Sequence, residues 1–253
     1  MERKILKEDS MGKIFVVGFG PGNKENMTID ALNAIEASDI IIGYTVYIEL
    51  MKKMYPLKEY QSTPMRSEIE RCRLCFEKAK EGKVVSLICS GDAGIYGMAS
   101  PVLSLADEYD FHDITIIPGV TAAVSGGTVL GSPLTSDFCV VSLSNALTPW
   151  EVIVKRLKAA ASGGFVTVLY NPRSKTRPGL LNEAVDIFIN EGVSKDTPSG
   201  YVKNIGRDKQ EYKILTLEEL KTADIDMFTT VFIGNEETEV INDRLVTRRG
   251  YKI

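Results

Sequence analysis

The chain has 253 residues and a mass of 27.9 kDa, which is long for one ordinary domain and natural for two of about 125 residues each. Hydrophobic residues make up 44% and charged residues 25%, which excludes a collagen, a coiled coil or a disordered chain. The 30 Lys and Arg residues and the 34 Asp and Glu residues give a net charge of −4. That balance disfavours a general nucleic-acid binder, because such proteins carry a basic surplus.

The N-terminus and the apolar runs of the sequence do not suggest a membrane or secretory protein. The N-terminus MERKILKEDS lacks the apolar region of a signal peptide, and no apolar run approaches the roughly 18 residues that cross a bilayer. We therefore expect a cytoplasmic protein without membrane association. Its four cysteines are too few for a disulfide scaffold and are expected to be reduced thiols.

From Lys13 onward, short apolar runs alternate with segments of helical periodicity, which is typical of an α/β protein with a mainly parallel sheet. The expected elements of the first half are a strand leading into a glycine loop (Lys13–Gly22), a helix with Thr28 as N-cap (Met27–Ala37), strands at Asp39–Gly43, Lys83–Cys89 and Asp113–Ile117, and a helix at Glu68–Lys80 with Ile69, Cys72, Phe76 and Ala79 on one face.

The pattern begins again after Pro133. The second half is expected to contain strands at Phe138–Leu143, Phe165–Tyr170, Gly200–Asn204, Glu211–Leu215 and Thr230–Gly234, and helices at Pro149–Ala161 and Pro178–Glu191. Only a short helix-like stretch separates the last two strands, which favours a mixed second sheet. Gly, Ser and Pro cluster at Ser132–Ser136, so we predict two α/β domains covering residues 12–134 and 135–253.

Glycines follow three of the strands of the first half, at Gly18–Gly22, Gly91–Gly94 and Pro118-Gly119. Ligands of open α/β sheets bind outside the carboxyl ends of the strands, so the three loops predict one binding crevice, although each is also compatible with a plain tight turn. A dinucleotide site is disfavoured, because the fingerprint requires glycine where the chain has Asn23, and no acidic residue follows the second strand.

These residues resemble the tetrapyrrole methylases, which use S-adenosylmethionine. The matching segments are GFGPGN (Gly18–Asn23), CSGDAGIYGMAS (Cys89–Ser100), PGVTAA (Pro118–Ala123), YNPRS (Tyr170–Ser174), NIGR (Asn204–Arg207) and TTVFIGN (Thr229–Asn235). GDAGIYGMAS together with YNPRS is most similar to the subgroup that methylates C17 of precorrin-3B or cobalt-factor III, with ring contraction, in cobalamin biosynthesis. The resemblance implies two α/β domains with a trough between them.

The resemblance also implies the contacts of the methyl donor, whose product is S-adenosylhomocysteine. Carried over by position, they come from Pro21, Ser90, Gly91, Asp92, Ile95, Thr121, Ala122, Asn171, Gly206 and Thr230. Gly91 lets the backbone approach the donor closely. Asp92 either accepts from the ammonium or ribose groups, or caps the next helix. The main task of such an enzyme is to align the acceptor carbon with the methyl group, and the sequence identifies no catalytic acid or base.

The implied acceptor is a polyanionic tetrapyrrole, for which a net acidic protein needs local cations. Arg66 and Arg173 are the candidates, with Lys175 and Arg177 beside them and a solvated surface charge as the alternative for each. We add Asn23 to the acceptor side; many family members have Asp there, and Asn cannot act as a carboxylate base. The resemblance further implies a homodimer.

Two other features are interpreted as structural. Cys72 and Cys75 have the spacing of half a metal site, but no second ligand pair exists and His112 is the sole histidine, so we expect core thiols, a surface histidine and no metal site. The alternative functions are a methyltransferase for another corrin carbon or another acceptor, and a non-catalytic corrinoid-binding protein.

Overall fold

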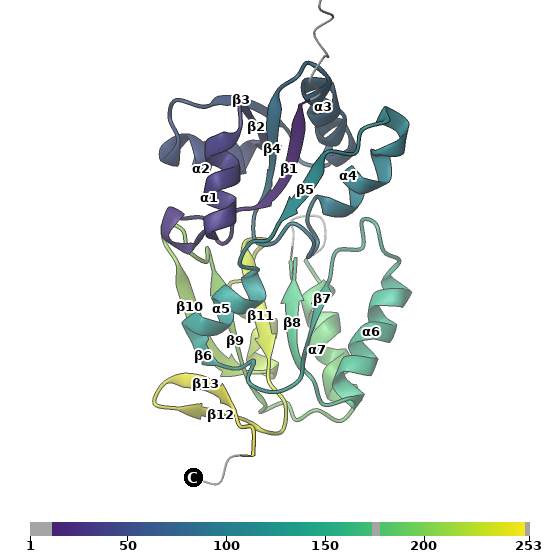
Figure 1. Ribbon diagram of the computed structural model, residues 1–253. Coiled ribbons are helices and arrows are strands. Elements are labelled where there is room, and N and C mark those ends of the chain that lie inside the picture. The colour runs from purple at the N-terminus through teal and green to yellow at the C-terminus, as the bar shows by residue number, and fades with distance from the viewer. Residues whose placement is uncertain (1–11, 174–177, 251–253) are drawn as a thin grey trace, which may run out of the picture. The chain divides into compact units, whose positions relative to one another are not determined.

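The computed structural model describes residues 12–173 and 178–250 (Figure 1). Its contacts divide the chain into two units that meet in sequence between Thr121 and Ala122. This division falls before the predicted boundary at 134–135, because helix α5 (Ala122–Leu130) packs on the sheet of the second unit. A Cβ on Gly126 of this helix would lie 3.0 Å from Ile205 Cδ1 and from Phe232 Cζ, so the glycine permits that close packing.

The first unit contains a five-stranded sheet in the order β3-β2-β4-β1-β5. Its strands are β1 (Lys13–Gly18), β2 (Ile40–Tyr44), β3 (Glu59–Thr63), β4 (Val84–Cys89) and β5 (Ile114–Ile117). Every pair of neighbours is parallel, so the carboxyl ends of all five strands lie at one edge. Four of the strands were predicted; the exception is β3, whose sequence EYQST lacks an apolar run.

Helices cover both faces of this sheet (Figure 1). They are α1 (Ile29–Ala37), α2 (Thr45–Met54), α3 (Glu68–Lys80) and α4 (Ala99–Leu105), with short 3-10 turns η1 (Lys24–Asn26) and η2 (Asp107–Tyr109). Ile40 and Ile42 of β2 belong to the core under α3 and α4, and Ile41 belongs to the core under α1 and α2. Successive strand side chains point to opposite faces, so a strand buried on both sides is continuously apolar.

Helix α3 has the bounds predicted from the sequence, but its buried face differs. Cys72, Phe76 and Ala79 are buried as expected, whereas Ile69 is 48% exposed, so its assignment to that face was wrong. Arg71 is buried instead. The predicted N-cap of α1 is confirmed, since the N–H of Ala31 donates to Thr28 Oγ1 over 3.1 Å.

The second unit contains a mixed sheet in the order β10-β9-β11-β8-β7. Its strands are β7 (Phe138–Ser142), β8 (Val166–Tyr170), β9 (Pro198–Lys203), β10 (Glu211–Thr216) and β11 (Thr229–Ile233). Only β7 and β8 pair in parallel among these neighbours, which confirms the predicted mixed sheet. Strand β11 therefore begins at the edge where β7, β8 and β9 end.

One face of the second sheet packs against α6 (Trp150–Ser162), α7 (Leu180–Asn190) and η3 (Glu218–Lys221), and the other packs against α5. A small sheet of β6 (Gly131–Ser132), β12 (Thr238–Ile241) and β13 (Arg244–Thr247) was not predicted. Across residues 12–173 and 178–250, no helix is both long enough and apolar enough to cross a bilayer.

Candidate functional site

The three glycine loops of the first unit meet at the carboxyl ends of β4, β1 and β5, which are neighbours in the sheet. Gly20 and Gly91 pair as an isolated antiparallel bridge, with N–H to carbonyl distances of 3.0 and 2.8 Å. Gly91 has φ +71°, a conformation that glycine adopts without the cost of a Cβ. The loop after β1 is therefore fastened to the loop after β4.

The loops after β1 and β5 approach even more closely. A Cβ on Gly119 would lie 2.3 Å from the carbonyl oxygen of Gly18 and 2.1 Å from that of Gly91. A Cβ on Gly18 would lie 2.6 Å from the same Gly91 oxygen. Only glycine fits at these two positions, because any Cβ would collide with the backbone of a neighbouring loop. The glycines expected to line a binding crevice therefore also allow the three loops to pack closely together.

Asp92 joins two of these loops through its carboxylate. Oδ1 accepts from the N–H of Gly94 (2.8 Å) and of Ile95 (3.1 Å), and Oδ2 accepts from the N–H of Gly119 (3.0 Å). The predicted alternative of a cap on the next helix was wrong, because α4 begins only at Ala99. A carboxylate has lone pairs beyond these three bonds, so Asp92 retains acceptor capacity for a ligand.

The other residues expected in the first unit lie on or beside these loops. Pro21 and Thr121 are buried, Ser90 is half-buried, and Ile95 is 41% exposed directly after the Asp92 turn. Asn23 is half-buried, and its Oδ1 accepts from Asn26 Nδ2 over 2.6 Å. The first unit thus brings its expected contact residues to one edge of its sheet.

In the second unit, the expected residues follow strands that end at one edge of the mixed sheet. Asn171 follows β8 with φ +52°, a conformation that Asn tolerates, and its Nδ2 donates to Ser142 Oγ at the end of β7 over 3.0 Å. Ala122 opens α5, where the next N–H, of Ala123, donates to Tyr170 Oη over 2.7 Å. This hydrogen bond of Tyr170 was not predicted; its signals in the sequence were the place of Tyr170 at a strand end and in the YNPRS segment.

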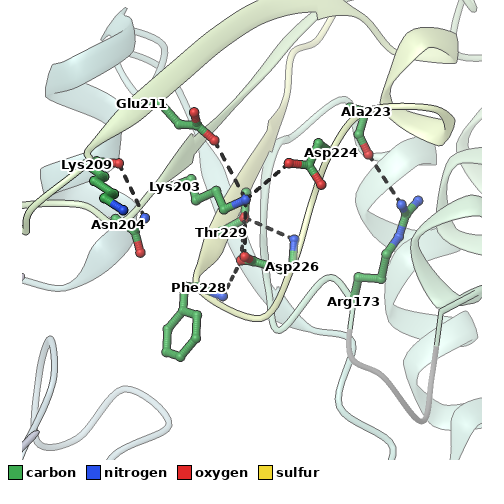
Figure 2. A network of polar contacts seen from close by, with 10 residues as sticks. All are labelled: Arg173, Lys203, Asn204, Lys209, Glu211, Ala223, Asp224, Asp226, Phe228 and Thr229. Carbon is green, nitrogen blue, oxygen red and sulfur yellow. Dashed lines mark hydrogen bonds and ion pairs between the residues drawn. The ribbon is translucent and has the colours of Figure 1, made fainter. Parts of the chain in front are cut away.

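Gly206 follows β9, where its N–H donates to Gln210 Oε1 over 2.7 Å, and Thr230 is a buried residue of β11. Between them lies a polar network that was not predicted (Figure 2). It surrounds Lys203, the last residue of β9, and Asp226 before β11.

Lys203 Nζ lies 3.2 Å from Asp226, 3.4 Å from Asp224 and 3.7 Å from Glu211 (Figure 2). Its side chain is 17% exposed. The hydrogen bond with the Asp226 carboxylate raises the pKa of Lys203 above its usual value, so the lysine is charged at neutral pH. The network ties the start of β11 to the end of β9.

The two arginines predicted to face the acceptor differ in their surroundings. Arg173 donates to the carbonyl oxygens of Lys221 (3.1 Å) and Ala223 (3.3 Å) and to Asn182 Oδ1 (3.0 Å), as Figure 2 shows in part. Arg66 is exposed and forms no hydrogen bond or ion pair with the described residues. Arg66 therefore has donors for a ligand, whereas Arg173 binds η3 and α7. Lys175 and Arg177 lie outside the described residues.

The thiols are inert in their surroundings. Burial raises the pKa of Cys72 to about 11 and raises the pKa of Cys75 well above its usual value, which keeps both thiols protonated at neutral pH. His112 is an exposed turn residue 3.6 Å from Asp110. No group of three metal-ligating side chains lies together within residues 12–173 and 178–250.

Two α/β units, with loops clustered at the carboxyl edge of a parallel sheet, are the arrangement in which open α/β sheets bind small molecules. The sequence profile of the tetrapyrrole (corrin/porphyrin) methylases matches residues 13–221. The chain belongs to this family, and the resemblance of its motifs is confirmed.

Among its relatives, the probable cobalt-factor III C(17)-methyltransferase of Salmonella typhimurium is 43% identical over 94% of this chain and 99% of that protein. The precorrin-3B C(17)-methyltransferase of a Sinorhizobium species is 35% identical over 91% of each chain. The solved structure of the methyltransferase CobJ superposes with a TM-score of 0.87 and 31% identity, over 94% of this chain and 100% of that one. These likenesses also confirm the predicted fold class.

Proposed function

We propose that this protein transfers a methyl group from S-adenosylmethionine to C17 of cobalt-factor III or precorrin-3B, with ring contraction, in cobalamin biosynthesis. One observation carries the proposal: a relative named for this reaction is 43% identical over nearly the full length of both chains. The cobalt-loaded acceptor has the stronger support, since the relative named for the metal-free acceptor is 35% identical. A homodimer in the cytoplasm remains our expectation.

The chemistry of the ten expected cofactor residues fits a cationic methyl donor. They supply backbone groups, two threonine hydroxyls, a serine, an asparagine amide and one carboxylate, with no lysine or arginine among them. A sulfonium is repelled by a neighbouring cation, whereas a phosphate-bearing dinucleotide favours one. This donor set therefore supports S-adenosylmethionine over the dinucleotide alternative.

The bound donor supplies a methyl group on a good leaving group, so the protein's task is to bind and to orient. Gly91, in its left-handed conformation, is held against Gly20 by two backbone hydrogen bonds and places no side chain between the loops and the donor. Asp92 holds the loops after β4 and β5 in one arrangement. Pro21 and Thr121 are buried beside them. Preorganised loops of this kind bind without the cost of ordering them.

On the acceptor side, Arg66 is the cation that the structure leaves available. A macrocycle with acetate and propionate arms requires such donors, and an arginine binds a carboxylate through two parallel hydrogen bonds. We propose Arg66 and Asn23 as acceptor contacts. Arg173 serves instead to hold the segment after β8 against η3.

The experiment is a calorimetric titration of the protein with S-adenosylhomocysteine, followed by incubation with S-adenosylmethionine and cobalt-factor III. We expect micromolar binding and a macrocycle heavier by one methyl group. Absence of binding at millimolar ligand would contradict the methyltransferase and favour a non-catalytic corrinoid-binding protein. Binding without transfer to this acceptor would favour a methylase for another acceptor.

A further inference from the structure

Arg71 is a buried arginine in the apolar face of helix α3. It is 4% exposed. Its Nε donates to Thr63 Oγ1 over 2.9 Å, one terminal nitrogen donates to the carbonyl oxygen of Pro64 over 3.0 Å, and the other lies 3.8 Å from Met98 Sδ. It forms no ion pair with a carboxylate of the described residues. The fold therefore buries a positive charge that only neutral acceptors balance.

Such an arrangement is unfavourable in itself, because a buried charge loses its hydration and a methionine of similar size packs without that loss. The two oxygen acceptors of Arg71 belong to one short segment, Thr63–Arg66, which begins at the last residue of β3. The Pro64 carbonyl oxygen has Arg71 as its hydrogen-bond donor. The planar guanidinium of Arg71 therefore donates two hydrogen bonds to this segment and fixes its position.

The segment that Arg71 holds ends in a strained residue. Arg66 has φ +70°, which is uncommon for a residue with a long side chain and persists only where the surroundings enforce it. Its guanidinium is exposed and unpaired among the described residues. Met98, the third neighbour of Arg71, ends the loop that begins at Gly91. One buried guanidinium therefore contacts two of the loops at the carboxyl edge of the sheet.

We propose that Arg71 is a positioning residue, which fixes the Thr63–Arg66 segment so that the exposed Arg66 guanidinium meets a carboxylate arm of the acceptor. The proposal rests on the proposed function, since it requires a polycarboxylate acceptor. Arg71 acts through Arg66 and does not touch the acceptor itself.

The test uses the full chain and uroporphyrin, a stable tetrapyrrole with acetate and propionate arms, whose binding is followed by its absorbance. Arg71→Met is expected to raise the dissociation constant of uroporphyrin about tenfold, the effect of misplacing one charge-assisted contact. Its affinity for S-adenosylhomocysteine should stay within about twofold of the native value. Arg73→Met is the matched control, because Arg73 lies on the same helix, is exposed, and has no partner among the described residues.

A double-mutant cycle separates positioning from a general loss of charge. Once Arg66→Gln has removed the contact, Arg71→Met should cause no further loss of uroporphyrin affinity. An additional tenfold loss in the Arg66→Gln background, or unchanged uroporphyrin binding by folded Arg71→Met, would overturn the proposal. Full rescue by Arg71→Lys would also overturn it, because lysine restores the charge without the two-sided geometry.

Thr63→Val keeps the test decisive if Arg71→Met does not fold. Valine preserves the volume of this buried residue and removes the acceptor of Arg71 Nε. We expect a rise of about threefold in the uroporphyrin dissociation constant, and no rise would contradict the proposal. Since this cycle measures binding, a native protein that binds uroporphyrin but does not methylate cobalt-factor III would contradict the proposed function alone.

Discussion

Gly119 donates its backbone N–H to Oδ2 of Asp92 over 3.0 Å, across 27 positions of the sequence. The same carboxylate accepts from two N–H groups of its own loop, those of Gly94 and Ile95. One side chain therefore fixes the loop after β4 and joins it to the loop after β5. Both loops carry residues of the proposed cofactor site.

Asp92→Asn tests this junction. The amide keeps one acceptor oxygen and places an NH2 group against a backbone N–H donor. We expect the free energy of unfolding to fall by about 1 kcal/mol, because the donors of Asp92 are half-buried or exposed and water replaces part of the lost interaction, and S-adenosylhomocysteine to bind about tenfold more weakly. Calorimetry and urea unfolding measure both effects. The exposed Asp110→Asn is the control, and unchanged affinity in Asp92→Asn would remove Asp92 from the site.

Arg173→Ala is expected to lower stability and to leave acceptor binding intact. The guanidinium donates to the carbonyl oxygens of Lys221 and Ala223 and to Asn182 Oδ1. Its removal leaves these acceptors without a donor, which should lower the free energy of unfolding by about 2–3 kcal/mol. Thermal unfolding measures the loss, with the exposed Arg156→Ala on α6 as control. Weaker uroporphyrin binding at unchanged stability would restore Arg173 as an acceptor contact.

Lys203→Met removes the cation that three carboxylates share, those of Asp226, Asp224 and Glu211. The carboxylates are partly exposed, so solvent screens them and we expect a loss of only about 1 kcal/mol. Added salt should reduce this loss, because it screens the remaining repulsion. Melting temperatures at low and high salt test this, with the exposed Lys155→Met as control. An effect independent of salt would contradict the electrostatic explanation.

Stability should decrease above pH 9. Burial raises the pKa of Cys72 and of Cys89 to about 11, from the ordinary cysteine pKa of 9.0. Between these values the unfolded thiols ionise while the folded ones keep their protons, so their contribution is complete below pH 9 and is lost toward pH 11. Each thiol contributes a slope of at most roughly 1.4 kcal/mol per pH unit. Urea unfolding of Cys72→Ala should show a shallower decline, and an identical decline would refute the assignment.

The sequence predicted the strands that are buried on both faces, because runs such as Ile40–Ile42 have no alternative to the interior of a sheet. It did not predict β3, whose polar side chains sit on an edge strand. It also missed the pair β12 and β13, which are four residues each and too short for a clear alternation of apolar and polar positions.

In the candidate site, too, some features could be predicted from the sequence and others could not. The three glycine loops could be predicted to meet, because parallel strands end at one edge. The partners of individual arginines could not. Arg173 binds carbonyl oxygens 48 and 50 positions away, and Arg71 enters an apolar helix face to bind a loop. Such contacts depend on packing between distant segments, which local pattern does not encode.

The most direct test of the central claim is the position of the transferred methyl group. The native protein is incubated with cobalt-factor III and S-adenosylmethionine that carries a deuterated methyl group, and the product is fragmented in a mass spectrometer. Our account predicts a single labelled methyl group on C17 of a contracted ring. Label on any other carbon, or an unlabelled macrocycle in a preparation that binds S-adenosylhomocysteine, would contradict it.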